Sequence, residues 1–282
     1  MSVAVCVGLM QCREMFGFKR KPVVPAPIPA EVPPGCVVWA VGDIHGRLDL
    51  LNSLLDGIQS DLDRSTAQRK VIICLGDYVD RGPDSLRVIE RLCQLADEGR
   101  VETHFLRGNH EDKMIEFLMD PNAGPEWCRY GGIEALASFG LKPPVLSHRM
   151  DSWISLSADL GHLLSDRHRR FLDELKTSVS IGGYFFVHAG ARPGVPLDAQ
   201  DASDLMWIRT RFLKDAGRFE KIIVHGHSRT PAIHVDERRI GIDTGAYESG
   251  ILSALRLEGF QRHALQAAEV DGEIRTGPLR PL

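Results

Sequence analysis

Acidic residues and an arginine follow one apolar run in a pattern that could bind a metal ion and a phosphate. Asp77, Asp80 and Arg81 lie in residues 75–82, which read Leu-Gly-Asp-Tyr-Val-Asp-Arg-Gly. The preceding residues, 71–74, are Val-Ile-Ile-Cys, and β-branched residues are typical of a buried strand. Ligands usually bind at the carboxyl ends of strands in an open α/β sheet. Because Asp and Gly are also common in turns, this stretch alone leaves an ordinary turn as the alternative.

Further polar residues that could bind a metal stand directly after other apolar runs. The candidate ligands at five strand ends are Asp43, His45, Asp77, Asn109, His188 and His227. They offer oxygen and imidazole donors without a thiolate, a set that suits hard or borderline divalent ions such as Mn, Fe or Zn. Six ligands are too many for one catalytic ion with open positions, but they suit two ions that share one carboxylate. Such a pair would acidify a bridging water and neutralise phosphate oxygens, as in-line hydrolysis of a phosphoester requires.

Residues between the ligands could supply the remaining groups for this chemistry. His110, next to Asn109, could protonate the leaving oxygen. Asp80 could fix the tautomer of His110, as a carboxylate behind a catalytic histidine does. Arg81 could hold a phosphate through two parallel hydrogen bonds. Arg107 could also face the site, or it could form a structural ion pair, and both interpretations stay open.

The apolar pattern predicts the elements that position these residues. Strands are expected over 36–41, 71–75 and 101–106, and apolar residues recur at helical spacing over 48–62 and 83–98. Strand–loop–helix units in succession predict a parallel sheet with right-handed crossovers. The ends of these strands then lie at one edge of the sheet, which would bring their polar residues together.

The rest of the domain is expected to hold a cap and more strands. Residues 114–177 change character, and we interpret them as mostly helices and loops that form a cap beside the metal edge. Further strands are expected over 184–187, 221–224, 239–242 and 251–257. The domain should therefore extend over 36–265.

Two terminal segments are expected to lie outside this domain. Residues 1–35 should be a disordered proline-rich segment, since six of the thirteen residues from Pro22 to Pro34 are prolines, which resist helix formation and packing. Translation could instead begin at Met15. Residues 266–282 are expected to form a loose C-terminal tail.

The composition limits the classes of function. The 282 residues are 43% apolar and 26% charged, and the formal net charge is −4, so bulk charge gives no support for nucleic-acid binding. No apolar run reaches the roughly 18 residues of a membrane span, so stable membrane insertion is not expected. The six cysteines form no C-x-x-C pair, and several lie inside apolar runs. Free thiols of this kind indicate a reducing cytoplasm.

Three blocks of this sequence resemble a known enzyme family. The blocks are Gly42-Asp43-Ile44-His45-Gly46, Gly76-Asp77-Tyr78-Val79-Asp80-Arg81-Gly82 and Gly108-Asn109-His110-Glu111. In this order they resemble the signature blocks of the phosphoprotein phosphatase (PPP) family of serine/threonine phosphatases, within the calcineurin-like metallophosphoesterases. The stretches 188–190 and 226–228 resemble the later metal-binding blocks. The resemblance covers roughly residues 36–258, and the chain looks more like the short bacterial members than the eukaryotic ones.

The resemblance implies a role for each candidate residue. The metal ligands would be Asp43 and His45 for the first ion, Asp77 as a bridge, and Asn109, His188 and His227 for the second ion. His110 would be the general acid, supported by Asp80, and Arg81 would bind the phosphate. Arg209 matches a second phosphate-binding arginine of the bacterial and phage-like members, with an arginine on a helix surface as the alternative.

Two further positions stay open under the resemblance. The family pattern places the last ligand directly after a glycine, which favours His227 over His225. Asp243 would either support a ligand histidine or form an ordinary turn between two strands.

The resemblance also implies a fold and an activity. The expected fold is α/β, the calcineurin-like metallophosphoesterase sandwich of two mixed β-sheets flanked by helices, with a helical cap region. The expected enzyme removes phosphate from serine or threonine of a phosphoprotein or phosphopeptide, by direct attack of a water or hydroxide that bridges two divalent metal ions. Mn is the expected metal, with Fe or Zn as alternatives.

Two other functions compete with this one. Hydrolysis of symmetrical diadenosine tetraphosphate, or of another small phosphoester, is the alternative enzyme activity, although members of the dinucleotide group usually depart from the full second block that holds Asp80 and Arg81. A catalytically silent scaffold is the third interpretation. The presence of every expected ligand argues against it.

Overall fold

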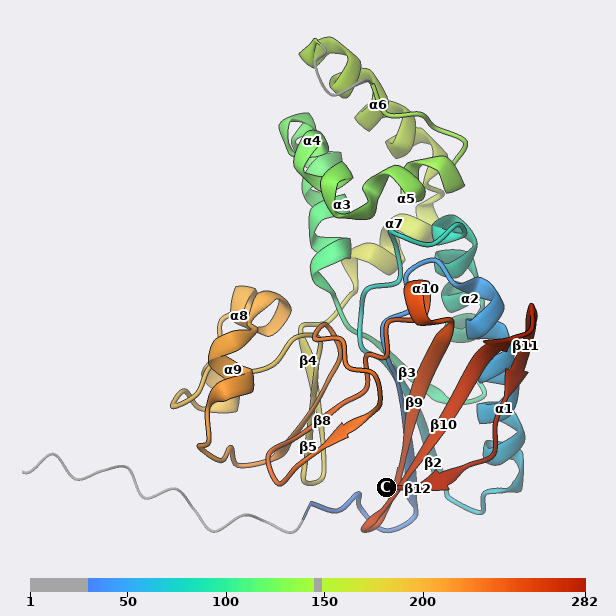
Figure 1. The fold of residues 1–282 in the computed structure, drawn as a ribbon, viewed down its shortest axis with the longest axis vertical. Helices are drawn as coiled ribbons and strands as arrows, with labels where there is room; N and C mark the ends of the chain where they lie inside the picture. Colours follow the sequence, from blue (N-terminus) through green and yellow to red (C-terminus); the bar gives the residue numbers. More distant parts are fainter. Residues whose placement is uncertain (1–29, 145–148) are drawn as a thin grey trace, which may run out of the picture.

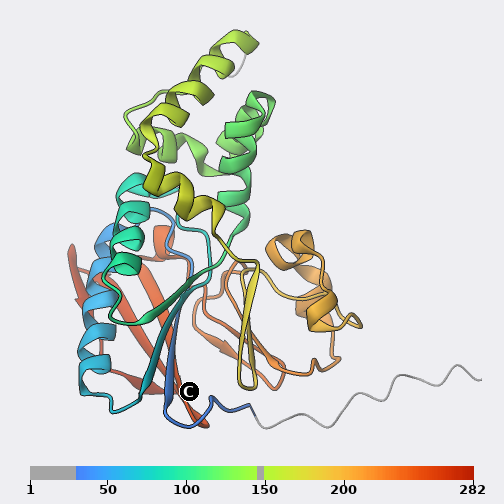
Figure 2. The same cartoon turned by 180° about the vertical axis from the view of Figure 1, so that it is seen from behind.

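Two β-sheets pack face to face in the structure, and helices cover both outer faces (Figure 1). The computed structural model describes residues 30–144 and 149–282. The view from behind shows the same layers with the two sheets exchanged between left and right (Figure 2). This arrangement confirms the predicted α/β sandwich of two mixed sheets.

The first sheet contains the strands that carry the first three blocks. Within the described ranges it has seven strands in the order β11-β10-β9-β1-β2-β3, with β12 also paired to β10. Its strands are β1 (Cys36–Val41), β2 (Arg69–Cys74), β3 (Glu102–Phe105), β9 (Ile251–Glu258), β10 (Gln261–Val270), β11 (Glu273–Thr276) and β12 (Arg280–Pro281). β1, β2 and β3 pair in parallel, as the successive strand–helix units predict. β9 runs antiparallel to β1, so the sheet is mixed.

The second sheet carries the two later histidines. Among the residues that the structure describes, it has five strands in the order β4-β5-β6-β8-β7. Their bounds are β4 (Ser178–Ile181), β5 (Tyr184–Val187), β6 (Ile222–His225), β7 (His234–Val235) and β8 (Arg239–Gly241). β5, β6 and β8 are parallel, while β4 and β7 pair antiparallel to their neighbours.

The alternation of side chains along β1 explains the layers. Val38 and Ala40 point toward the second sheet and join its buried residues in one apolar cluster. Val37, Trp39 and Val41 point to the opposite face, because successive side chains of a strand alternate, and there they meet α1 (Leu48–Arg64) and α2 (Ser85–Asp97). On the far face of the second sheet, residues of α8 (Ala202–Trp207) and α9 (Thr210–Lys214) complete the packing.

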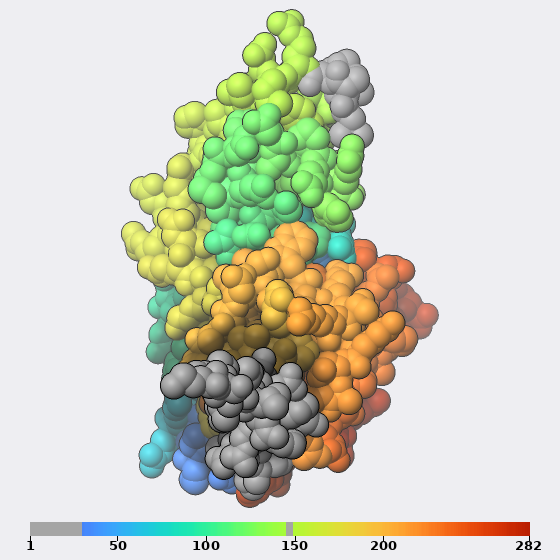
Figure 3. Space-filling model, turned by 90° about the vertical axis from the view of Figure 1, so that its left-hand side faces the viewer, coloured from blue at the N-terminus to red at the C-terminus, as the bar shows by residue number. Residues whose placement is uncertain are grey.

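A group of helices stands above the strand ends and forms the predicted cap (Figure 1). It comprises η1 (Pro121–Ala123), α4 (Gly124–Trp127), η2 (Cys128–Gly132), α5 (Ile133–Ser138), α6 (Met150–Leu163) and α7 (Asp166–Asp173), and α3 (Asn109–Met119) leads into it from the end of β3. The space-filling view shows the cap projecting beyond the body of the molecule (Figure 3). The short elements η3 (Leu197–Ala199) and α10 (Ala246–Ser249) lie in loops of the second half.

The predicted loose tail over 266–282 is wrong. β10 pairs with β9 along its length, and β11 and β12 then pair with β10. Leu265 and Ala267 are buried on the face that meets α1. The turn between β10 and β11 is Asp271-Gly272, both with positive φ, which is a strong hairpin signal. Large apolar residues are sparse in this segment, so the hydrophobic pattern alone does not reveal the strand.

The predicted start of the domain at residue 36 is also slightly wrong. Val32 is buried, and its N–H donates to the carbonyl oxygen of Gly259. The carbonyl oxygen of Glu31 accepts the N–H of Gly183, so residues 30–35 are held against the domain. Residues 1–29 of the predicted disordered segment lie outside the described residues. In the described ranges, no helix combines the length and apolar character needed to cross a bilayer.

The paired C-terminal strands predict a measurable contribution to stability. Leu265→Ala should lower the free energy of unfolding by about 2–5 kcal/mol, because it leaves a cavity between β10 and α1. Urea denaturation measures this change. Leu279→Ala, at a residue that is 37% exposed, is the matched control and should change stability by less than about 0.5 kcal/mol. Equally small changes in both variants would contradict the packing of β10 on α1.

Candidate metal centre

The six predicted metal ligands meet at one edge of the sandwich. Asp43 follows β1, Asp77 follows β2, and Asn109 begins α3 just beyond β3. His188 follows β5 and His227 follows β6, so both sheets contribute. The carboxyl ends of these parallel strands point to the same edge, which is why residues from distant parts of the chain come together.

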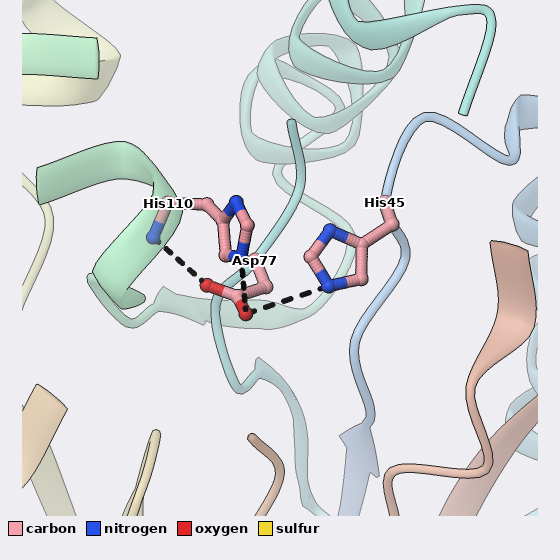
Figure 4. Close-up of side chains that lie close together, drawn as sticks. All are labelled: His45, Asp77 and His110. Carbon is pink, nitrogen blue, oxygen red and sulfur yellow. Dashed lines mark hydrogen bonds and ion pairs between the residues drawn. The ribbon is translucent and has the colours of Figure 1, made fainter. Parts of the chain in front are cut away.

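Asp77 lies at the centre of the group. Its Oδ2 is 3.5 Å from Nε2 of His45, and its Oδ1 is 3.3 Å from Nε2 of His188. Figure 4 shows His45 and His110 on either side of this carboxylate. Two sets of potential ligands, His45–Asp77–His110 and Asp77–His188–His227, have their ligand atoms within 4.8 Å of one another. Both sets contain Asp77, and the first includes His110 where the sequence predicts Asp43 as the ligand.

The histidines present a ring nitrogen to this site because the other nitrogen is already occupied. Nδ1 of His45 donates to the carbonyl oxygen of Val79 at 2.9 Å, and Nδ1 of His188 donates to that of Leu75 at 2.9 Å. Carbonyl oxygens only accept, so Nε2 of each ring faces the site and can bind a metal ion when it carries no proton. In His227 it is Nδ1 that faces the site, 2.7 Å from Oδ1 of Asn109 and 3.2 Å from Nε2 of His188. These contacts fix the rings in orientations that suit metal binding.

Burial keeps two of these imidazoles uncharged. It lowers the pKa of His45 to about 3, with the charge of His110 adding to the effect. It lowers the pKa of His227 to about 2, and His188 adds to that shift. A neutral imidazole is the form that binds a metal.

The surroundings of the Asp43 carboxylate show that the ligand group suits metal cations. Its Oδ2 accepts the N–H of His227 at 2.9 Å, whereas its buried Oδ1 has no hydrogen-bond partner among the residues that the structure describes. Gly226 approaches so closely that a Cβ there would lie 1.9 Å from Oδ1. Burial, then the nearby charges of Asp243 and Asp77, raise the pKa of the Asp43 carboxyl well above its ordinary value. A buried carboxylate oxygen without a hydrogen-bond donor is unfavourable unless a cation binds it. These residues therefore fit divalent cations.

His110 and Asp80 form a buried pair beside the ligands. Nδ1 of His110 lies 2.7 Å from Oδ2 of Asp80, and its Nε2 lies 3.9 Å from Oδ2 of Asp77. Burial opposes the charged imidazole, but the carboxylates of Asp77 and Asp80 raise the pKa of His110 above its ordinary value. His110 can therefore hold a proton close to the ligand group.

The two predicted phosphate-binding arginines also reach this site. Arg209 lies just before α9, and its Nε donates to Nε2 of His227 at 2.8 Å. The guanidinium of Arg81 lies over the ring of Tyr247, 4.7 Å from its centroid. Both arginines line a cavity of about 430 Å³ together with Asp43 and Asp77.

Three residues left open by the sequence have other contacts. His225 points away, since its Nδ1 meets its neighbour's carbonyl and its Nε2 lies 3.1 Å from Nη1 of Arg239. Asp243 accepts the N–H of Gly245, as a turn aspartate does, and it also lines the cavity beside Asp43. Arg107 forms an ion pair with Asp112 at 2.8 Å.

The backbone of the site is strained. Five non-glycine residues of the site have positive φ, namely His45, Asp77, Asp80, Arg81 and His227. Residues other than glycine rarely adopt a positive φ, and each such residue destabilises the fold by on the order of 1–3 kcal/mol. The surrounding hydrogen bonds must therefore hold these residues in place.

Glu111 provides much of this support, and sequence reasoning missed it. Its fully buried carboxylate accepts the N–H groups of Asp77, Tyr78, Val79 and Gly108 at 2.7–3.2 Å. It thereby ties the loop after β2 to the start of α3. Glu111 is the third residue of the helix that follows Gly108, the position of the glutamate in a capping box, which is a signal that the sequence does contain.

The chain belongs to the calcineurin-like phosphoesterase family. Residues 36–251 match the family model of that description. This confirms the resemblance in the three blocks and defines the protein as a metallophosphoesterase, a hydrolase of phosphoesters whose family uses a dinuclear metal centre.

Relatives within this family differ in their named substrates. The chain is 29% identical over 229 residues to serine/threonine-protein phosphatase 2 of Escherichia coli, covering 78% of this chain and 93% of that protein. It is 27% identical over 236 residues to the asymmetrical bis(5'-nucleosyl)-tetraphosphatase PrpE of Geobacillus thermodenitrificans, covering 77% of this chain and 88% of that protein.

Solved structures share the fold. One provisionally described as a diadenosine tetraphosphatase has a TM-score of 0.57 at 21% identity, covering 86% of this chain and 96% of that one. The cold-active protein-tyrosine phosphatase of a psychrophilic Shewanella species has a TM-score of 0.51 at 18% identity, covering 87% of this chain and 83% of that one. At these identities the likeness concerns the fold alone.

Asp77→Asn should weaken both metal positions, because one carboxylate contacts both sets of ligands. After equilibration with Mn and desalting, elemental analysis should find about two ions per wild-type chain and a clear deficit in the variant. Asp151→Asn, on the exposed side of α6, is the control and should match the wild type. Two tightly held ions in Asp77→Asn would disprove the bridging role.

Glu111→Gln should destabilise the loop after β2, since the new amide directs N–H groups at backbone donors. The expected loss in free energy of unfolding is about 1–3 kcal/mol, accompanied by weaker Mn binding. Chemical denaturation and Mn titration measure the two effects. Glu116→Gln, on the exposed face of the same helix, is the matched control. A variant as stable as this control would contradict the supporting role of Glu111.

Proposed function

We propose that this chain is a metal-dependent serine/threonine protein phosphatase that hydrolyses phosphomonoesters. The observation that carries this proposal is the grouping of Arg81, Arg209 and the His110–Asp80 pair around the ligands. Two guanidinium groups suit the oxygens of a phosphate dianion. A protonated imidazole beside them suits a leaving alkoxide, which needs a proton.

The ligand set supports a cofactor of two divalent metal ions, for which we propose Mn. The residues that would hold them are Asp43, His45, Asp77, Asn109, His188 and His227. Ions bound there would acidify a water molecule and neutralise phosphate oxygens. Arg81 and Arg209 would orient the phosphate by charge-assisted hydrogen bonds. Asp80 accepts a hydrogen bond from Nδ1–H of His110. This leaves the proton on Nε2 for transfer to the serine or threonine oxygen.

The cavity lining favours a phosphoryl group over a nucleobase. The lining residues are Asp43, His45, Asp77, Arg81, Arg209, Thr210, Leu213, His227, Ser228, Arg229, Asp243 and Tyr247. Nearly all are charged or polar, whereas a base needs an apolar or aromatic face to stack on. The ring of Tyr247 already contacts the guanidinium groups of Arg81 and Arg229. A phosphorylated side chain of a protein fits such a cavity.

The similarity to PrpE enzymes favours one second candidate, hydrolysis of a dinucleoside tetraphosphate. The relatives that support it are named as asymmetrical hydrolases, so an asymmetrical cleavage replaces the symmetrical one expected from the sequence. The four described cysteines, Cys36, Cys74, Cys93 and Cys128, are buried free thiols. They support a reducing compartment such as the cytoplasm for either activity.

A direct assay separates the two candidates. The protein is stripped of metal, resupplied with Mn and given a phosphoserine peptide or diadenosine tetraphosphate. Release of phosphate from the peptide, with little cleavage of the nucleotide, is the expected result. Cleavage of the nucleotide alone would contradict the proposed function.

His110→Asn should lower kcat on the phosphoserine peptide by about 10²–10⁴-fold, because the leaving oxygen loses its proton donor. Bound Mn, measured by elemental analysis, should stay at the wild-type amount. His162→Asn, on an exposed residue of α6, controls for the preparation. Turnover equal to that of this control would remove His110 from the role of general acid.

A further inference from the structure

One turn of the cap contacts both the general-acid pair and a phosphate-binding arginine. We call residues 127–132, at the junction of α4 and η2, the cap turn. Nε1 of Trp127 donates to both oxygens of Asp80, at 3.1 and 2.9 Å. Both side chains are fully buried, with 0% exposure. The carboxylate behind His110 is therefore held from outside the ligand group, by the cap.

The same turn holds Arg81. The carbonyl oxygen of Gly131 accepts the backbone N–H of Arg81 at 3.1 Å. The carbonyl oxygen of Tyr130 lies 3.4 Å from Nε of Arg81. Gly131 has a φ of 115°, and a Cβ there would lie 2.6 Å from Cγ of Arg81. Only glycine allows this approach.

The cap turn contacts two residues whose backbone conformation is unfavourable. Asp80 and Arg81 have φ values of 72° and 66°, which are unfavourable for non-glycine residues. The ring of Trp127 itself is fixed by Gly132, since a Cβ there would lie 2.6 Å from the indole. It also packs on Phe117, with the ring centroids 5.3 Å apart. The indole is thus a rigid donor aimed at a strained loop.

We propose that Trp127 is a positioning residue that orients the Asp80 carboxylate, and through it His110, for proton donation to the leaving group. This role rests on the proposed phosphomonoesterase activity. Without the indole N–H, Oδ1 of Asp80 loses its donor and the carboxylate can rotate away from His110. The phosphate-binding residues and the metal ligands keep their own contacts.

A positioning role of this kind has a specific kinetic signature. Proton donation matters for a poor leaving group such as a serine alkoxide and little for p-nitrophenolate, which leaves without a proton. Trp127→Phe should lower kcat on a phosphoserine peptide by about tenfold or more. On p-nitrophenyl phosphate, kcat should stay within about twofold. KM and bound Mn should be unchanged for both substrates.

Two comparisons separate positioning from loss of packing. Trp153→Phe makes the same change at a buried cap residue that packs on Phe117 rather than on Asp80, and it should leave both rates near wild type. In the Asp80→Asn background, Trp127→Phe should add less than about twofold, because both changes act through the same carboxylate. If Trp127→Phe does not fold, benzothienylalanine at position 127 keeps the ring shape, lacks the N–H, and should give the same signature.

The outcomes distinguish this inference from the proposed function. A wild-type enzyme that acts on neither monoester contradicts the proposed function and this role with it. A wild-type enzyme that acts on both, with equal loss on the two substrates in the variant, contradicts only the role of Trp127. A full additional loss in the Asp80→Asn background would also overturn it.

Discussion

Two carboxylates, those of Asp43 and Asp77, are buried where the two sheets meet, and the rest of the structure depends on how their charge is compensated. A buried carboxylate is costly unless donors or positive charge surround it. Burial would raise the pKa of Asp77, but His188 and His110 hold it well below its ordinary value. Oδ1 of Asp43 has no partner among the described residues. Divalent ions would complete this compensation, so folding and metal binding are linked here.

Holding these ligands requires support from outside the strand ends. Several site residues adopt unfavourable backbone conformations, and two elements secure them. Glu111 binds the loop after β2 from the side of α3, while the cap turn binds Asp80 and Arg81 from the cap. The cap is therefore part of the machinery and not only a cover.

Much of the site can be predicted because its ligands stand directly after apolar runs, and parallel strands end at one edge. His227 could be preferred over His225 only through the family pattern, and the two-sheet arrangement also rested on that resemblance. Trp127 could not be found, because its contact with Asp80 joins residues 47 positions apart and depends on how the cap folds. The hairpin at Asp271 is hard to predict because its strands carry few large apolar residues, although its turn has a clear signal.

Anomalous X-ray diffraction from crystals grown with Mn would show whether Asp77 is shared by two metal ions. Data collected on either side of the Mn absorption edge locate the ions without reference to activity. We expect two peaks, one between Asp77 and the Asp43–His45 side, the other between Asp77 and the group of Asn109, His188 and His227. A single peak, or ions that do not contact Asp77, would contradict a dinuclear centre built on a shared carboxylate.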